Sequence, residues 1–275
     1  MMENRTDLAL ESYESSDATR IDGVIVREKG ELNIVKIINE KGAKALGKPI
    51  GNYITLSYEA FINDVDLFDG RLDTFISALK SIFPENAKSV LVAGLGNNEI
   101  TADSLGPKTN NYILSTRHII DDLKEVLNIT NVFPVSSIAT GVLGETGIET
   151  AEIIMGIVEQ IKPDCVIVID ALSASSTERL GSTIQLSDCG ISPGSGVGNH
   201  RFEISKKTLG VPVIAIGIPT VVCTSIISGN EKDTAFVTPR EIDRITDQGA
   251  KLIGMGINSA LQKEINVSDL YALVG

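Results

Sequence analysis

The chain has no tryptophan, two histidines and three cysteines among its 275 residues, and aromatic residues make up 4% of it. Cys165, Cys189 and Cys223 are odd in number and widely separated, so they form neither a disulfide framework nor a zinc site of paired cysteines. Cys165 lies inside an apolar run, and we expect it to be buried as a small hydrophobic residue. The scarcity of histidine also excludes most histidine-based catalytic arrangements. His118 lies in a helical pattern, whereas His200 follows a glycine-rich loop and is the better candidate for an active-site rim.

Positive charge and long apolar runs are scarce as well. The chain has 24 Lys and Arg against 36 Asp and Glu, a formal net charge of -12. Such a surface repels phosphate backbones, so we expect no direct binding to nucleic acid. No apolar run is long enough to span a bilayer, and the polar residues 1–17 lack the apolar core of a secretory signal. We therefore expect a cytoplasmic protein without membrane attachment.

The remaining composition, 43% hydrophobic and 22% charged, is typical of a globular protein. The length is compatible with one large domain, which we favour over two small ones. Residues before about Asp22 show no periodic apolar pattern and predict an extended leader outside the core.

Apolar periodicity predicts the regular elements of this domain. Alternating patterns predict half-buried strands over residues 23–39, with a turn at Lys29 and Gly30, and over 52–60. Continuous apolar runs predict parallel strands covered on both faces, over 89–96, 165–172 and 211–222. Helical spacing predicts helices over 66–83, 146–162 and 238–261, the last capped by Thr238 with Pro239 at its first position. This order predicts a single α/β domain with a mostly parallel central sheet flanked by helices and decorated by N-terminal strands.

Two aspartates follow apolar strands in this scheme. Functional residues gather at the carboxyl ends of parallel strands, and Asp170 ends the run 166–170. Asp103 lies in the loop after residue 92, in which Gly94 and Gly96 allow a sharp turn and Asn97 can brace the backbone. If the two strands are parallel neighbours, both carboxylates lie at the same edge of the sheet.

Two facing carboxyl groups share a proton, because ionising both at short range is unfavourable. One then acts as a base toward water and the other polarises a peptide carbonyl. Structural alternatives stay open: Asp103 can cap a helix, Asp170 can bind backbone amides of a nearby turn, and a metal ion can bridge the pair. A serine nucleophile has no support, because the chain has no G-x-S-x-G elbow.

The ordered set RTDLALE, GLGNNEITADSLGP, TGIET, VIVIDALSA, SPGSGVGN, IGIPTVV and VTPREID resembles the spore germination protease family. The resemblance covers nearly the whole chain and implies a fold like that of the hydrogenase maturation endopeptidases. It places the functional aspartates at Asp103 and Asp170. From the residues themselves, we expect the active-site loops to include Gly94, Gly96, Asn97, Asn199 and His200. We expect no cofactor and no metal, although a metal that bridges the two aspartates stays an alternative.

The resemblance also implies substrates, assembly and processing. Members of the family degrade small acid-soluble spore proteins during germination, which places this chain in the forespore or spore core, and a homo-oligomer such as a tetramer is expected. They are zymogens that cut off an N-terminal propeptide at a site like that of their substrates: an acidic residue, then an apolar one, a small one and a Glu. Thr6-Asp7-Leu8-Ala9-Leu10-Glu11 fits this form. We therefore predict cleavage between Asp7 and Leu8, with residues 1–7 as propeptide and 8–275 as the protease domain.

Three departures from the family and three rival functions accompany this interpretation. The segment between IGIPTVV and VTPREID is short, which puts family-like oligomer contacts in doubt, and Cys223 and His200 stand where Asp and Lys are more usual. A metal-dependent endopeptidase of the hydrogenase maturation type would need His200. A peptidyl-tRNA hydrolase is disfavoured by charge and by the distance from GLGN to Thr116-Arg117-His118. The third rival is a non-enzymatic Rossmann-like ligand-binding module.

Overall fold

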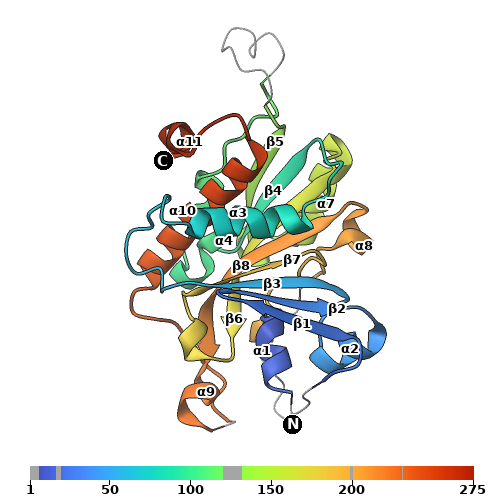
Figure 1. Ribbon diagram of the computed structural model, residues 1–275, viewed down its shortest axis with the longest axis vertical. Helices are drawn as coiled ribbons and strands as arrows, with labels where there is room; N and C mark the ends of the chain where they lie inside the picture. The colour runs from blue at the N-terminus through green and yellow to red at the C-terminus, as the bar shows by residue number, and fades with distance from the viewer. Residues whose placement is uncertain (1–5, 17–19, 120–131, 199–200, 231) are drawn as a thin grey trace.

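One mixed β-sheet runs through the molecule (Figure 1). The structure is a computed structural model that describes residues 6–16, 20–119, 132–198, 201–230 and 232–275. In these ranges the sheet has nine strands in the order β1-β2-β3-β7-β8-β6-β4-β5, with β9 paired to β8. The strands are β1 Val24–Lys29, β2 Leu32–Ile37, β3 Gly51–Ser57, β4 Val90–Leu95, β5 Val135–Gly141, β6 Cys165–Ala174, β7 Thr183–Ser187, β8 Val213–Cys223 and β9 Phe236–Val237.

Helices cover both faces of this sheet (Figure 1). α3, α4 and α10 pack on one face over the largest hydrophobic cluster, while α7 and α8 cover the other face of the parallel strands and α1 and α2 cover that face of β2 and β3. The described helices are α1 Ala9–Glu14, α2 Glu40–Leu46, α3 Arg71–Ile82, α4 Leu105–Asn111, α6 Leu143–Thr146, α7 Thr150–Ile161, α8 Lys206–Leu209, α9 Thr224–Ser228, α10 Ile242–Leu261 and α11 Val267–Val274. Among them, none is both long and apolar enough to cross a membrane.

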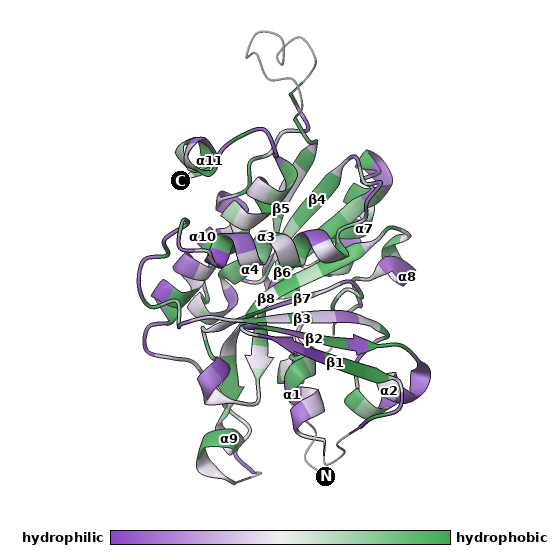
Figure 2. Ribbon diagram, viewed as in Figure 1, coloured by the Kyte–Doolittle hydropathy of each residue, from purple (hydrophilic) through white to green (hydrophobic). Residues whose placement is uncertain are grey.

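The predicted fold class is confirmed. The four strands β8, β6, β4 and β5 are parallel, and β8, β6 and β4 are the apolar core of the sheet (Figure 2). Successive residues of β6 alternate between the two helix layers: Ile167 and Ile169 face the α10 side, while Val166 and Val168 face the α7 side. Burial on both faces explains why β8, β6 and β4 are continuous apolar runs, whereas β5, which the sequence did not predict, is mostly half-buried and partly polar. Cys165 has no exposed surface, as expected.

The N-terminal strands join the sheet through β7, which the sequence did not predict. β7 pairs antiparallel with β3 on one side and with β8 on the other. β7 is only five residues long and carries polar Thr183, Gln185 and Ser187 on one face. Its alternation of apolar and polar residues is therefore too short to indicate a strand. Without it, the predicted β1–β3 decoration had no defined place on the parallel strands.

Two predictions about the chain ends are wrong. The last long helix begins at Ile242 with Glu241 as its N-cap residue, and the Thr238 hydroxyl donates instead to the Thr220 carbonyl, 2.8 Å away. The residues before Asp22 include a packed element rather than a loose leader: α1 and the preceding Leu8 are buried, with Leu10 3% exposed against Val35, Ile37 and Tyr53. One and a half helical turns are too short to show a period in the sequence.

Replacing Leu10 tests whether α1 belongs to the core. We expect Leu10→Ala to lower the free energy of unfolding by about 2–4 kcal/mol, because it leaves a cavity between α1 and the sheet. Leu273→Ala, on a side chain that is 62% exposed, is the control and should change it by less than about 0.5 kcal/mol. Urea unfolding of the full chain measures both. Equal, small effects would contradict the packing of α1.

Candidate active site

Asp170 lies where β4 ends and β6 continues. The last β4 residue paired with β6 is Gly94, opposite Ile169, whereas β6 runs on to Ala174 beside β8. The prediction that Asp170 ends its strand is therefore wrong by four residues. Because the β4 side is open from Asp170 onward, the carboxylate has space beside it although it is only 6% exposed. Its Oδ1 accepts a hydrogen bond from the Ala171 N–H at 2.9 Å.

Asp103 reaches this place through a tightly folded loop. It ends a 3₁₀ turn, Thr101–Asp103, and its Oδ2 accepts a 2.7 Å hydrogen bond from the Asn97 N–H. The carboxylate thus closes the loop on itself instead of capping α4, which begins at Leu105. Asn97 also braces the loop as predicted, since its Oδ1 accepts from the Glu99 N–H at 2.7 Å.

Glycines make this loop possible because it folds back onto the strand ends. A Cβ on Gly94 would lie 2.2 Å from the Gly106 carbonyl oxygen, and a Cβ on Gly106 would lie 2.6 Å from the Ile169 carbonyl oxygen. Gly96 has φ +109°, and a Cβ there would meet the Asp103 carbonyl oxygen at 2.0 Å. The backbone of residues 94–106 therefore packs directly on β6, which brings Asp103 toward Asp170.

The environment of both carboxyls favours protonation. Burial raises the pKa of Asp170 well above its ordinary value, and the charges of Asp103 and Asp7 raise it further. Burial also raises the pKa of Asp103, helped by Glu145, while the hydrogen bond from the Asn97 N–H acts in the opposite direction. The two aspartates therefore differ: Asp170 is the group more strongly held in its neutral form.

Asp103 and Asp170 line the same cavity, of about 470 Å³. Gly96 and Asn97 also line it, whereas Gly94 lies behind the wall, under Gly106. Asn199 and His200 lie outside the described residues. The rest of the wall comes from the turn before α6, the start of α7, β6 and the loop that ends at Arg201, whose guanidinium lies 3.6 Å from Glu149.

The N-terminal segment also reaches this cavity, which the sequence did not predict. Asp7 lines it, and the Asp7 carboxylate accepts 2.9 Å hydrogen bonds from the Ser173 N–H and from the Ser195 hydroxyl. The Asp7 N–H donates in return to the Ser173 carbonyl at 2.9 Å. A Cβ on Gly196 would lie 2.3 Å from the Asp7 carboxylate, so a glycine is needed there. The aspartate of the predicted cleavage site is thus held against β6, three residues from Asp170.

Gln185 of β7 holds the backbone on either side of the Asp7–Leu8 bond. Its Nε2 donates to the Asp7 carbonyl at 3.0 Å, and its Oε1 accepts from the Ala9 N–H at 2.8 Å. Gln185 and Asp170 flank Gly217 of β8 in register, so all three lie in one row across the same face of the sheet. The alternation of polar residues in Thr183–Ser187 is the only sequence feature that could have indicated Gln185, and it has a meaning only once this segment is known to be strand β7.

Metal chemistry has no cluster to support it in the described residues. Within them, no group of three or more His, Cys, Asp or Glu side chains is arranged to hold a metal ion. His118 is exposed, as predicted for a surface residue. In the described ranges the cavity is lined by backbone groups and by carboxyl side chains, among them Asp7, Asp103 and Asp170, while the Gln185 amide binds the Asp7 carbonyl beside it.

Comparison with known proteins agrees with this geometry. The family model for germination protease matches residues 2–235. The chain belongs to the germination protease family. The germination protease of Clostridium tetani is 39% identical, over 98% of each chain, and that of Caldanaerobacter subterraneus subsp. tengcongensis is 40% identical over the same shares. That of Priestia megaterium is 43% identical over 97% of this chain and 76% of its own length.

The family membership establishes a protease of spore germination that acts on protein substrates. Among solved structures, a [NiFe] hydrogenase maturation protease from Thermococcus kodakarensis is similar, with 16% identity, a TM-score of 0.40 and coverage of 66% of this chain and 99% of that one. The catalytic roles of individual residues in this germination protease stay predictions that mutation can test.

Substitution of Gly94 tests the packing of the Asp103 loop. We expect Gly94→Ala to lower the free energy of unfolding by more than about 2 kcal/mol, since its Cβ would collide with backbone atoms that cannot move independently. Gly156→Ala is the matched control. Gly156 lies inside α7, and a Cβ there would meet nothing within 4 Å beyond the backbone of its own helix, so alanine should stabilise by about 0.5–1 kcal/mol. Chemical denaturation of both variants decides the point.

The raised pKa of Asp170 predicts a pH-dependent stability. A carboxyl that stays protonated in the fold but ionises in the unfolded chain costs stability as pH rises above about 4, until the pKa of the folded state is reached. Asp170→Asn removes this cost. Near pH 4 the variant should have the same free energy of unfolding as the wild type. Near pH 7.5 its free energy of unfolding should be higher by about 1 kcal/mol or more, with a higher Tm. A Tm difference that does not change with pH would refute a raised pKa.

Proposed function

We propose that this chain is an endopeptidase that degrades small acid-soluble spore proteins in the spore core, by hydrolysis with the paired carboxyls of Asp103 and Asp170. The observation that carries the proposal is the meeting of both aspartates on one cavity, in a chain of the germination protease family. Like-charged carboxyls in a shared, partly desolvated site divide into an acid and a base.

The surroundings of the two groups assign their roles. Asp170, which is buried and lies near two other carboxylates, keeps the proton and donates a hydrogen bond to the carbonyl oxygen of the substrate peptide. Asp103, whose ionised form is stabilised by the Asn97 N–H, takes a proton from water. The water oxygen bonds to the carbonyl carbon, and the resulting tetrahedral centre expels the amine, which receives the proton held by Asp103. No covalent enzyme intermediate forms.

The same site is proposed to cut its own chain between Asp7 and Leu8. In support, Asp7 lines the cavity of the two aspartates, and the carbonyl oxygen of the bond to be cut accepts from Gln185. Residues 1–7 would then be a propeptide and 8–275 the mature protease. While Asp7 is docked, it occupies part of the cavity beside Asp170 that a substrate needs, which is consistent with a zymogen. Assembly into a homo-oligomer remains a prediction.

Cleavage of a purified small acid-soluble spore protein tests the aspartate pair. The full chain, Asp103→Asn, Asp170→Asn and the control Asp22→Asn, an exposed residue paired with Lys41, are compared with and without chelator. We expect each site variant to lose about 10²–10⁴-fold in rate and to stay uncut at Asp7, while Asp22→Asn behaves as the wild type. Mass spectrometry of the N-terminus reports self-cleavage in the same samples.

Each other result has a definite meaning. Chelator sensitivity would indicate a metallopeptidase. Undiminished cleavage by either site variant would refute the assignment of that aspartate. Loss of cleavage in Asp22→Asn as well would show that the assay follows stability rather than chemistry.

A further inference from the structure

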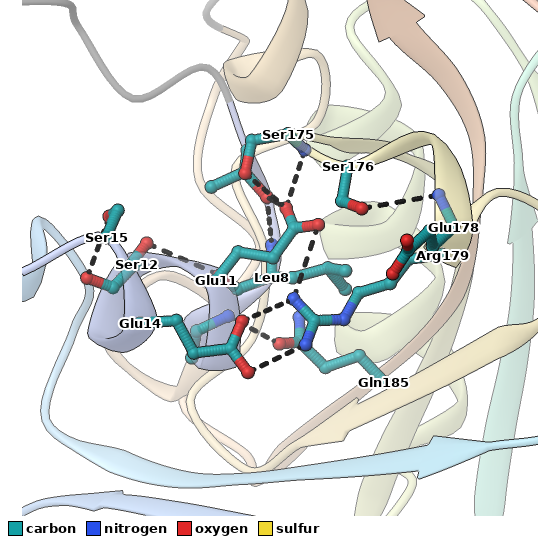
Figure 3. A network of polar contacts seen from close by, with 12 residues as sticks. Leu8, Glu11, Ser12, Glu14, Ser15, Ser175, Ser176, Glu178, Arg179 and Gln185 are labelled. Carbon is teal, nitrogen blue, oxygen red and sulfur yellow. Dashed lines mark hydrogen bonds and ion pairs between the residues drawn. The ribbon is translucent and has the colours of Figure 1, made fainter. Parts of the chain in front are cut away.

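Besides Asp7, the N-terminal segment has a second carboxylate, that of Glu11, that is bound by the body of the protein (Figure 3). Glu11 is 3% exposed although it lies in a short surface helix. Its Oε2 accepts hydrogen bonds from the Ser175 N–H at 2.6 Å and from the Ser175 hydroxyl at 2.9 Å. Its Oε1 lies 3.5 Å from the guanidinium of Arg179. A buried carboxylate with these partners occupies a built anion site.

Apart from the Thr6 hydroxyl, which also donates to Glu11 Oε2, the groups that receive Glu11 do not belong to the N-terminal segment. Ser175 directly follows β6, and Arg179 ends the 3₁₀ turn Thr177–Arg179, which the Ser176 side chain caps by accepting from the Glu178 N–H. The carboxylate receptor therefore lies directly after the strand that carries Asp170 and begins five residues beyond that aspartate. Glu14 also pairs with Arg179, at 2.7 and 2.8 Å, but from the solvent side, with its side chain 48% exposed.

Between Asp7 and Glu11, the N-terminal segment fills an apolar site with Leu8. Leu8 has no exposed surface and packs with Leu172, Ala174, Leu180 and Ile191. The chain then turns into α1, where the Ser12 N–H donates to the Leu8 carbonyl at 3.2 Å. One helical turn thus places Glu11 over Ser175 while Gln185 holds the backbone of Asp7 and Ala9. The contacts of Asp7, Leu8 and Glu11 form one continuous binding path that starts at the catalytic cavity.

We propose that Ser175 and Arg179 form a specificity site that binds an acidic substrate side chain four residues after the acidic residue at the cleaved bond. The inference rests on the proposed protease function and assigns the residues that bind the Glu of the cleavage-site motif. Glu11 of the intact chain is the first occupant, and a substrate segment takes its place when α1 is displaced, which requires that Ala9 and Leu10 leave their packing on β2 and β3. Hydrogen bonds to a charged partner are worth more than neutral ones, and a neutral occupant leaves the Arg179 charge partly unpaired.

Cleavage of short peptides tests this site. The probe is a peptide with the sequence of residues 3–16, compared with the same peptide carrying Gln at position 11 and with one carrying Gln at position 14. We expect kcat/KM to fall about tenfold for Gln at position 11 and less than about threefold for Gln at position 14, because exposed pairs contribute little. The segment of the enzyme itself competes equally with all three peptides, so the ratios are preserved.

Variants of the full chain locate the effect. In Arg179→Gln the preference for Glu at position 11 should fall to about twofold or less, and in Ser175→Ala it should be roughly halved. Arg244→Gln, which removes an exposed pair with Asp64, should keep the tenfold preference. If Arg179→Gln does not fold, as judged by circular dichroism, Ser175→Ala and the wild-type peptide ratios still decide.

Two results would overturn the proposal. Equal cleavage of the Glu and Gln peptides by the wild type would show that no carboxylate is recognised at this position, while leaving the protease function intact. An unchanged preference in Arg179→Gln would place the recognition elsewhere. Failure of the wild type to cut any peptide or spore protein would instead refute the proposed function, and this inference with it.

Discussion

The carboxyl groups of Asp103 and Asp170 are brought together in a partly desolvated space, where their ionised forms repel each other. The rest of the site is arranged around this pair. The backbone of residues 94–106 packs on β4 and β6 without side chains at Gly94 and Gly106, so the loop cannot relax away from Asp170. Burial raises the pKa of both aspartates, and the charges of Asp103 and Asp7 raise that of Asp170 further. Each carboxylate accepts a backbone hydrogen bond, Asp103 from the Asn97 N–H and Asp170 from the Ala171 N–H. The proposed difference between acid and base therefore follows from the deeper burial of Asp170 and its charged neighbours.

The same strand that carries Asp170 also receives the N-terminal segment. β6 runs past the end of β4, and this continuation offers the Ser173 backbone to Asp7 and leads to the Ser175 backbone that binds Glu11. β7 supplies Gln185 from the next strand but one. The segment is bound mainly through carboxylates and backbone groups, with Leu8 as its apolar anchor. Such binding is specific for a pattern of acidic and apolar side chains rather than for one shape.

This arrangement connects the two proposals made for the protein. A segment that is to be cut must lie where substrates lie, so its contacts describe the recognition of substrates in the same groove. The net charge of -12 makes this more demanding, because acidic segments approach a surface that repels them. Local cations and donors, Arg179 and the backbone of β6, compensate for that repulsion only along the binding path.

The sequence by itself determined the parallel core, because strands buried on both faces must be continuously apolar, and it showed an aspartate within one of those strands and another in the loop after a second. Family motifs pointed to Asp103, Asp170 and the Asp7–Leu8 bond. Only the tertiary structure decided where β7 inserts, that β6 extends beyond Asp170, and that α1 is packed and its Glu11 bound. The place of β7 and the length of β6 depend on pairing with strands distant in the sequence, and the docking of α1 depends on contacts between residues more than 160 positions apart, such as Ser175 with Glu11 and Gln185 with Ala9. No local pattern of apolar and polar residues predicts such contacts, because Ser175, Glu11 and Gln185 are each residue types that usually lie on the surface.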